Sequence, residues 1–257
     1  MGKRVLLHTK GCEEEIARLV SAEGRVTVTG LARRFDVTED CIRKDLRQLE
    51  AAGALRKVYG GAVSVSSPPE RSVIKRVGAH SAEKRLVAEK AFDMIEPGET
   101  IFLDVSTTNL ALAELLSSGT KHVSVVSTMM GILRVLARNP ALEVLGTGGS
   151  VNTELDGFMG SMTLACLRPL RFDRAFLGGL GVDVESGEVT TYLWDDAQVK
   201  QLAMANSSHC LLMVDEHKFG AGGSYVYAHV GDFDGIVTNR VTTELASAVE
   251  GLGSTLV

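Results

Sequence analysis

Three adjacent hydroxyl side chains, Ser106, Thr107 and Thr108, stand between an apolar run and a helical pattern in this 257-residue chain. They belong to the loop 104–109, DVSTTN, which ends at Asn109. A helix start offers backbone N–H groups and the positive end of the helix dipole, which together bind phosphate. The pattern therefore predicts an anion site at this loop. The plainer interpretation is a set of capping residues that only begins the helix.

Glycines and charged residues farther along the chain supply other groups that such a site needs. The loop 146–150, GTGGS, permits close approach of the backbone to a ligand, or simply forms a tight turn. Lys200 and Lys218 can neutralise a phosphate. The carboxylates of Asp104 and Asp215 can accept hydrogen bonds from sugar hydroxyls. For each residue alone, a surface lysine or a loop-capping aspartate is the common alternative. The predicted ligand-binding residues are Asp104, Ser106, Thr107, Thr108, Asn109, Gly148, Gly149, Lys200, Asp215 and Lys218.

A second kind of chemistry is indicated by residues 38–50, TEDCIRKDLRQLE. Thr38 can cap a helix through its hydroxyl. Apolar residues recur at spacings of four and three, so one face packs inward and Arg43, Lys44 and Arg47 point outward. A short helix with an exposed basic edge suits insertion into the major groove of DNA. Taken alone, an ordinary surface helix is an equally good interpretation.

The preceding segments place this helix in a helix-turn-helix unit. Residues 13–22 and 27–35 carry apolar residues at helical spacing, and a brief strand is expected at 25–27 between them. Residues 36–37 leave only a tight connection before the next helix. Two short helices joined by a tight turn form the helix-turn-helix unit, in which the second helix reads the DNA.

Residues 54–65, ALRKVYGGAVSV, suit a small β-hairpin, or wing, after the reading helix. Arg56 and Lys57 on this hairpin can reach phosphates, although a plain hairpin that closes the domain is the alternative. The predicted DNA-binding residues are Thr27, Thr38, Asp40, Cys41, Arg43, Lys44, Arg47, Arg56 and Lys57.

The charge distribution agrees with an N-terminal nucleic-acid interface. The chain carries a net charge of −5, but residues 1–60 hold 12 Lys and Arg against 9 Asp and Glu. Residues 61–257 hold 15 against 23, and an acidic body repels DNA. No apolar run reaches the length of a signal-peptide core or of a membrane span, so we expect a cytoplasmic protein without membrane contact.

The four cysteines stand far apart and form no CxxC pair; they are Cys12, Cys41, Cys166 and Cys210. This spacing argues against a zinc site and against a disulfide framework. Cys41 lies in the predicted reading helix, where a small filler residue is favoured over a redox switch. We therefore expect reduced thiols, and neither a metal site nor a cofactor.

The rest of the chain predicts an α/β domain. Residues 65–78 are polar with paired prolines, which indicates an extended connector rather than a helix. Beyond them, apolar β-rich runs alternate with helical patterns, which is typical of a mostly parallel sheet covered on both faces. Ligands of such sheets bind at the carboxyl ends of the strands. The predicted parts are a winged helix-turn-helix domain at 12–66, a linker at 67–80, an α/β domain at 81–240 and a C-terminal tail at 241–257.

The N-terminal stretch GRVTVTGLARRFDVTEDCIRKDLRQLEAAGALRKVYGGAV resembles the DNA-binding domain of DeoR-type bacterial transcription regulators. The shared pattern has a glycine before the strand-like link, V-x-x-L-A-x-x-F-x-V-[ST], I-R-[RK]-D-L on the reading helix and a terminal G-G-A. So many elements at matching spacing over about forty residues make chance agreement improbable. The resemblance implies a winged helix-turn-helix fold that binds operator DNA.

The C-terminal half is similar to the effector domain of the same family. The matching motifs are D-x-x-T-T, a later G-G, F-L-G-x-x-G-[IV], V-K and D-x-x-K-F-G, in this order. That domain is Rossmann-like and related in fold to ribose-5-phosphate isomerase, which implies a sugar-phosphate pocket. Family effectors are typically phosphorylated sugars or related metabolites.

Several positions depart from the family pattern, among them the helix segment WDDAQVK, where the family more often has glutamates. Ser106 stands where the family usually has the glycine of D-S-G-T-T, and it either narrows the loop or adds a hydroxyl contact. Glu216 and His217 stand where small polar residues are common. These two side chains either alter ligand selectivity or face solvent.

Together these features predict a DNA-binding transcriptional regulator, most simply a repressor of carbohydrate-metabolism genes that a phosphorylated sugar controls. Two-fold operators imply a homo-oligomer, a dimer or a tetramer. A sugar-phosphate isomerase with an appended N-terminal domain is the alternative from another class, since Asp104 and Asp215 are candidate bases. However, fold relationship alone does not carry an activity. A third option is an effector domain that binds no ligand and serves assembly only.

Overall fold

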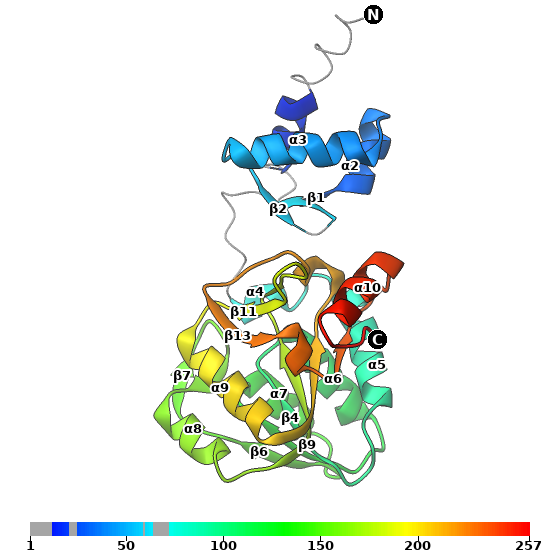
Figure 1. Cartoon of the computed structure of the whole chain (residues 1–257). Helices are drawn as coiled ribbons and strands as arrows, with labels where there is room; N and C mark the ends of the chain where they lie inside the picture. The colour runs from blue at the N-terminus through cyan, green and yellow to red at the C-terminus, as the bar shows by residue number, and fades with distance from the viewer. Residues whose placement is uncertain (1–11, 21–24, 59, 64–71) are drawn as a thin grey trace, which may run out of the picture. The chain divides into compact units, whose positions relative to one another are not determined.

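The computed structural model describes residues 12–20, 25–58, 60–63 and 72–257. The chain divides into two compact units, with the boundary between Pro69 and Glu70 (Figure 1). Each unit has its own hydrophobic core, and each is described by itself. Among the described residues, no helix is both long and apolar enough to cross a bilayer.

The N-terminal unit is the expected winged helix-turn-helix. It contains a helix at residues 12–20, β1 (Arg25–Thr27), α2 (Val28–Phe35), α3 (Glu39–Ala51), β2 (Arg56–Val58) and β3 (Gly61–Val63). Its core joins the apolar faces of the three helices with the sheet, and Ile16, Ile42 and Leu46 are among its most buried members. Residues 12–20, α2 and α3 therefore form one packed body, in which α3 keeps its polar face outward.

The turn between α2 and α3 is fixed by local hydrogen bonds. Asp36 adopts the left-handed conformation at φ 53°, and the N–H of Val37 donates to Ala32 O at 3.1 Å, which ends α2. Thr38 then caps α3, because its hydroxyl accepts from the N–H of Cys41. Thr27 caps α2 in the same way.

The wing is a three-stranded antiparallel sheet in the order β1-β3-β2. Gly60 turns the hairpin with φ 73°. Gly61 is required for a different reason: a Cβ atom there would lie 1.9 Å from the carbonyl oxygen of Val26 on β1. The expected brief strand at 25–27 is thus confirmed, and it supports the wing as its third strand.

The C-terminal unit is built on a six-stranded parallel sheet in the order β14-β12-β9-β4-β5-β6. These strands are β4 (Thr100–Leu103), β5 (Ser124–Ser127), β6 (Glu143–Gly146), β9 (Phe172–Gly178), β12 (Ser207–Met213) and β14 (Gly235–Val237). The helices are α4 (Val73–Arg76), α5 (Ser81–Asp93), α6 (Thr107–Ser118), α7 (Met130–Leu136), α8 (Ser161–Leu167), α9 (Trp194–Ala205) and α10 (Thr243–Gly251).

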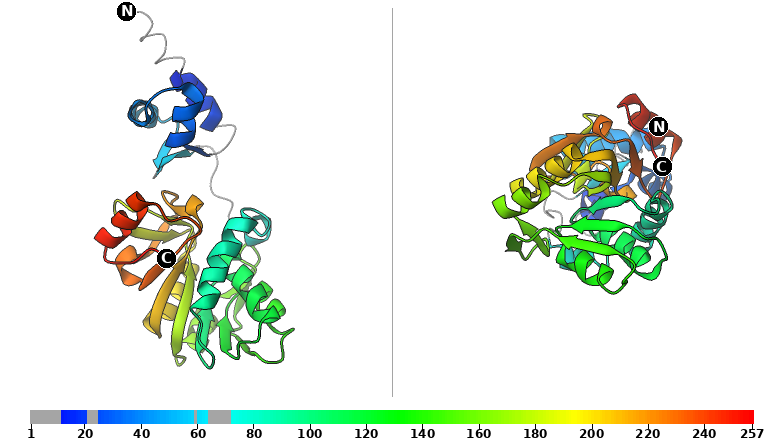
Figure 2. Two further views of the ribbon diagram at one scale, coloured as in Figure 1. Left: turned by 90° about the vertical axis from the view of Figure 1, so that its right-hand side faces the viewer. Right: turned by 90° about the horizontal axis from the view of Figure 1, so that it is seen from below.

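Helices cover both faces of this sheet (Figures 1 and 2). α5 and α6 lie side by side against β12, β14 and β9, whereas α9 packs against β9 and β12. The chain moves outward from β4 through β5 to β6, and in the opposite direction from β9 through β12 to β14. Right-handed crossovers in opposite directions place their helices on opposite faces. The predicted Rossmann-like fold class is therefore confirmed.

The strand order reverses between β4 and β9, which are hydrogen-bonded neighbours. At such a switch point the loops leave the sheet in opposite directions and open a crevice at the carboxyl ends of the strands. The predicted loop 104–109 follows β4 directly, and Gly178 ends β9. The fold thus brings these two segments, about 70 residues apart in sequence, to one place.

Two small sheets did not follow from the pattern of apolar runs. β7 (Ser150–Asn152) and β8 (Gly157–Met159) form a hairpin, and β10 (Gly181–Val182), β11 (Glu188–Thr191) and β13 (Tyr225–His229) form a second antiparallel sheet. Two short 3₁₀ helices, η1 (Glu216–Lys218) and η2 (Val230–Asp232), complete the unit.

The segments that flank the predicted α/β domain are ordered parts of this unit. The expectation of an extended connector is wrong for its second half, since α4 forms there, Val73 is buried and its N–H donates to Glu154 O at 2.7 Å. Residues 64–71 lie outside the described part. The segment 241–257, expected as a tail, contains α10 and extends the sheet edge, where the N–H of Val257 donates to Ile236 O at 2.8 Å.

Truncation of the core of the N-terminal unit should unfold it selectively. Leu46 on α3 is 1% exposed, so Leu46→Ala should lower the free energy of unfolding by about 3 kcal/mol through lost burial and a cavity. Hydrogen exchange of the α3 amides measures this loss. The control is Gln48→Ala on the exposed side of the same helix, which should change the stability by less than about 0.5 kcal/mol. Equal protection of α3 in both variants would contradict the assigned core.

Candidate functional site

A buried charge network occupies the switch point between β4 and β9. Asp104 is fully buried, and its Oδ2 atom accepts hydrogen bonds from Lys200 Nζ and from the N–H of Gly178 at 2.9 Å. Lys200 comes from α9, is 2% exposed and also lies 3.4 Å from Oδ2 of Asp196. The hydroxyl of Thr191 donates to the same Asp196 oxygen at 2.6 Å. One ammonium group is thus shared by two buried carboxylates.

The environment shifts the pKa values of both partners upward. Burial raises the pKa of Asp104 to about 6, and Asp196 adds to this rise while Lys200 opposes it. Burial by itself lowers the pKa of Lys200, but the two carboxylates outweigh it and hold that pKa above its usual value. Lys200 therefore remains charged, and its charge is committed inside the protein. The sequence predicted Lys200 as a phosphate partner, whereas its contacts are with the carboxylates that line the site.

The start of α6 is tied to both strands at the switch point. The hydroxyl of Ser106 accepts from the N–H of Asn109 at 2.9 Å and so caps the helix. The side-chain amide of Asn109 donates to Asp104 O at 3.1 Å and to Phe176 O at 2.7 Å, which links β4 to β9. A Cβ atom at Gly178 would lie 2.6 Å from Cβ of Ser106, so a glycine is needed opposite this serine.

Polar side chains collect at the carboxyl ends of the strands. Thr107 and Thr108, in the first turn of α6, are both buried. Several buried polar side-chain atoms have no protein hydrogen-bond partner among the described residues. On the C-terminal unit these include Asp104 Oδ1, Asn109 Oδ1, Asp196 Oδ1, Thr128 Oγ1, Thr147 Oγ1 and Thr238 Oγ1. Four of these residues, at positions 104, 128, 147 and 238, directly follow the last residues of β4, β5, β6 and β14.

Buried polar atoms normally have partners, from protein, water or ligand. All of these atoms are shielded from solvent, and the four that follow strand ends are spread along the carboxyl edge of the sheet from β14 to β6. Among the predicted residues, Asp104, Ser106, Thr107, Thr108 and Asn109 meet at this edge. Gly178, Thr128 and Asp196 belong to the same region, although the sequence analysis did not select them. The i, i+4 spacing of Asp196 and Lys200 was a visible signal, but surface ion pairs show it equally often.

The remaining predicted ligand-binding residues lie on other loops of the same unit. Asp215 is buried after β12 and caps η1 through a hydrogen bond from the N–H of His217 at 3.0 Å. Lys218 is the last residue of η1. Gly148 and Gly149 follow β6 with φ values of 67° and 124°. The hydroxyl of Thr163 on α8 donates to Gly148 O at 2.8 Å, so this loop rests on α8.

The reading helix presents its basic residues on one exposed edge. The guanidinium of Arg43 pairs with Glu39 at 2.7 Å and with Asp40 at 2.8 Å, on the surface. Surface pairs of this kind contribute little stability, so they can be exchanged for phosphate contacts at small cost. Lys44 and Arg47 are exposed, and Nε of Arg47 donates to Arg43 O at 3.2 Å.

The other predicted DNA-binding residues lie at the helix starts and on the wing of the same unit. Thr27 and Thr38 use their hydroxyls as caps, and the hydroxyl of Thr38 also contacts the Sγ atom of Cys41 at 3.3 Å. The thiol of Cys41 is exposed and unbridged. On β2, Arg56 is exposed and Lys57 is half-buried, with its N–H donating to the carboxylate of Glu50 on α3 at 2.7 Å.

Comparison with known proteins assigns a family to each unit. Residues 13–68 match the family described as DeoR-like helix-turn-helix domain, and residues 79–240 match the DeoR C terminal sensor domain. The chain is 29% identical over 241 residues to the lactose phosphotransferase system repressor of Staphylococcus epidermidis, covering 92% of this chain and 94% of that protein. It is 31% identical over 215 residues to an uncharacterized HTH-type transcriptional regulator, FruR, of Bacillus subtilis, covering 83% and 84%.

Solved structures with a similar fold are more distant. Ribose 5 phosphate isomerase A from Neisseria gonorrhoeae aligns with a TM-score of 0.40 at 18% identity, over 54% of this chain and 53% of that chain. The tetrameric eIF2B-beta2-delta2 complex from C. thermophilum aligns with a TM-score of 0.49 at 15% identity, over 81% of this chain and 64% of that chain.

The raised pKa of Asp104 predicts a specific dependence of stability on pH. The unfolded carboxyl titrates near 3.8 and the folded one near 6, so between these values the folded state binds the proton more tightly. The free energy of unfolding should therefore fall as the pH rises from about 4 to about 6.5, by on the order of 2–3 kcal/mol relative to Asp104→Asn, which cannot titrate.

Urea unfolding followed by the fluorescence of Trp194, the single tryptophan of the chain, measures this difference because that residue lies on α9 of the C-terminal unit. A difference between the two proteins that stays constant or grows with rising pH would contradict the assigned environment of Asp104.

Proposed function

The chain belongs to the DeoR family of DNA-binding transcriptional regulators, and we propose that it represses carbohydrate-metabolism genes under the control of a phosphorylated sugar. The observation that carries the sugar part is the set of hydroxyl and amide side chains at the start of α6, which follows β4 where the strand order reverses. The family and the names of the relatives indicate a regulator and not an enzyme. The isomerase alternative therefore has no support beyond the distant likeness in fold. A regulator of this class acts on the chromosome, so we place it in the cytoplasm.

The DNA-binding surface in this proposal is the exposed edge of α3 together with the wing. Lys44 and Arg47 are the principal contacts, because both are exposed and three residues apart on one side of the helix. Arg43 joins them after leaving its surface ion pairs. Arg56 and Lys57 contact phosphates from the wing, as positively charged side chains at the rim of such domains do. A palindromic operator would then require a homo-oligomer, a dimer or a tetramer.

The effector in this proposal lies at the switch point of the sheet. Its phosphate binds at the first turn of α6, where Thr107 and Thr108 lie at the positive end of the helix dipole. Lys218 contributes a positive charge from η1, and Gly148 and Gly149 line the far side. Sugar hydroxyls reach Asp104 and Asn109 only when the loops at the switch point open, since both side chains are fully buried. Lys200 acts indirectly by holding Asp104 in place.

Control of DNA binding follows if the effector binds two arrangements of the chain with different affinities. Such a ligand shifts the population toward the arrangement that it prefers, and so changes the apparent affinity for operator DNA. A sensor domain that only assembles the oligomer would leave DNA affinity independent of any sugar.

Removal of basic residues from the reading helix should weaken DNA binding. Arg47→Ala and Lys44→Ala should each lower the affinity for DNA from the chain's own promoter region by about 1–3 kcal/mol. A lost phosphate contact should also reduce the slope of affinity against salt by about one unit. Fluorescence anisotropy at several salt concentrations measures both quantities. The control is Arg85→Ala on α5, whose exposed arginine pairs with Glu89. Equal loss in the control, or no loss in the helix variants, would refute the assigned surface.

Ligand binding at α6 should appear in a thermal-shift screen of the full chain against phosphorylated and unphosphorylated sugars. A ligand at 100 times its dissociation constant stabilises by about 2.7 kcal/mol. We expect a shift with phosphorylated compounds only, and its loss in Thr107→Val and Lys218→Ala. Ser118→Ala removes a hydroxyl at the opposite end of the same helix and should keep the shift. A shift that survives in Thr107→Val and Lys218→Ala would place the ligand elsewhere.

A further inference from the structure

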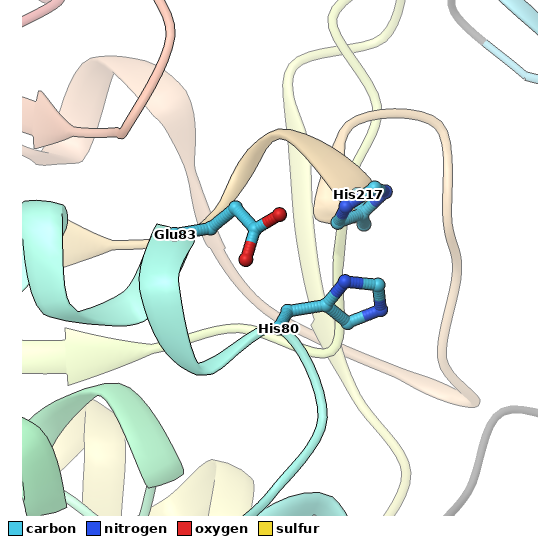
Figure 3. Close-up of side chains that lie close together, drawn as sticks. All are labelled: His80, Glu83 and His217. Carbon is cyan, nitrogen blue, oxygen red and sulfur yellow. The ribbon is translucent and has the colours of Figure 1, made fainter.

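Two histidines and a glutamate converge on the C-terminal unit outside the network around Asp104. His80 and Glu83 project from the start of α5, and His217 projects from η1 (Figure 3). One ligand atom of each residue lies within 4.8 Å of the others, and the two imidazole rings stand 3.9 Å apart between centroids. His80 is exposed, while Glu83 and His217 are partly buried. Side chains more than 130 positions apart thus meet at one point of the surface.

The segment that carries His80 and Glu83 is held by a buried lysine. Lys84 donates from Nζ to the carbonyl oxygens of Arg76, at 2.7 Å, and of Ala79. Arg76 is the last residue of α4, and Ala79 stands directly before His80. The N–H of Lys84 also donates to His80 O at 3.0 Å, as the first turn of α5 requires. The backbone of His80, which has φ 53°, is therefore positioned by the helix that follows it.

The segment that carries His217 is held independently. Its own N–H donates to Asp215 Oδ1 at 3.0 Å, and the N–H of Glu216 donates to Asn239 Oδ1 at 2.8 Å. The carboxylate of Glu216 pairs with Arg240 at 3.1 Å and is thus engaged on another side of η1. Each of the two backbone segments is thus fixed by its own contacts. The three side chains are therefore brought close together by the fold and not by contacts with one another.

From this arrangement we propose that His80, Glu83 and His217 bind a divalent transition-metal ion of the Zn²⁺ type. Two imidazole nitrogens and one carboxylate oxygen suit Zn²⁺, Ni²⁺ or Co²⁺, whereas Mg²⁺ and Ca²⁺ prefer sites made of oxygen ligands. Ligands of a tetrahedral ion with bonds of about 2.0–2.1 Å stand about 3.4 Å apart. Rotation of the three side chains, none of which is fully buried, closes the remaining gap.

The ion connects two parts of the unit that the sheet leaves separate. It joins the first turn of α5 to η1, and Asp215, which caps η1, and Lys218, which ends it, belong to the proposed effector site. Three protein ligands leave at least one coordination position open to water or to an oxygen of another ligand. The carboxylate of Glu83 also offsets the repulsion between a cation and the positive end of the α5 dipole. The metal site does not require the effector proposal, since its ligands are separate residues.

The test uses the full chain without a polyhistidine tag, stripped with a chelator and titrated calorimetrically with Zn²⁺. We expect one equivalent to bind, and an excess of Mg²⁺ not to compete. His217→Ala and Glu83→Gln should each weaken binding at least about tenfold, since even residues that only support a metal ligand commonly contribute that much. His80→Asn, which tolerates the left-handed backbone, should do the same. The control is His122→Ala, an exposed histidine outside the cluster, which should bind as the wild type does.

Three results would overturn the proposal. The first is no binding by the wild-type chain, and the second is unchanged binding by both His217→Ala and Glu83→Gln. The third is a sulfur-to-metal charge-transfer band with Co²⁺, which would place the ion on a cysteine such as Cys166 instead. Unchanged Trp194 emission and thermal unfolding of the apo-proteins verify that each variant is folded, so that lost binding reports lost ligands.

Discussion

The sharing of one buried ammonium group by two buried carboxylates is the constraint on which the C-terminal unit depends. Lys200 comes from α9, on one face of the sheet, and Asp104 from the end of β4. Removing one partner of a buried pair commonly costs about 3–5 kcal/mol, which is a large part of the free energy of unfolding of most domains. The network therefore fixes where α9 lies against the sheet, and with it the geometry of the loops at the switch point.

The same network gives Lys200 the role of positioning Asp104, so that Lys200 is not itself a ligand-binding residue. Because Lys200 is satisfied inside the protein, an anionic ligand has to be met by the start of α6 and by residues on other loops. Asn109 strengthens this division, since its amide group bonds to the carbonyls of both β4 and β9 while its Oδ1 atom stays unpaired. These bonds make a rigid frame at the switch point, which positions the loops that follow the strands.

Positive and negative charges are distributed unequally between the two units of the chain. The reading helix has its basic residues on one edge, while the α/β unit lies in the acidic part of the sequence. Local hydrogen bonds fix the turn and the start of α3, because Asp36 ends α2 and the hydroxyl of Thr38 caps α3. In the proposed complex with DNA this surface is preformed, and the surface ion pairs of Arg43 are contacts that have to rearrange.

Sequence patterns were sufficient for the elements that have a strong period or a specific turn. The helix-turn-helix, the wing and the central parallel sheet follow from apolar spacing and from glycine positions such as Gly60. The short strands β10, β11 and β13 were missed because two to five residues give no clear period. α4 was missed because four residues are too few to show a helical period, and the buried Val73 anchors it.

The candidate sites were predictable only in part. The loop 104–109 was visible because its residues are contiguous. The roles of Gly178 and Asp196 depend on pairing between β4 and β9 and on where α9 docks, which no local pattern encodes. The same holds for His80 and His217, whose meeting is a property of the fold alone.

The central claim is that a phosphorylated sugar bound at the switch point changes the affinity of the N-terminal unit for operator DNA. Titration of labelled promoter DNA with the full chain, at one salt concentration and with each member of a sugar-phosphate panel, tests it most directly. The account predicts that one phosphorylated compound changes the dissociation constant by about fivefold or more, in the range of known couplings, while its unphosphorylated form does not. Tight DNA binding that no member of the panel alters would contradict the account.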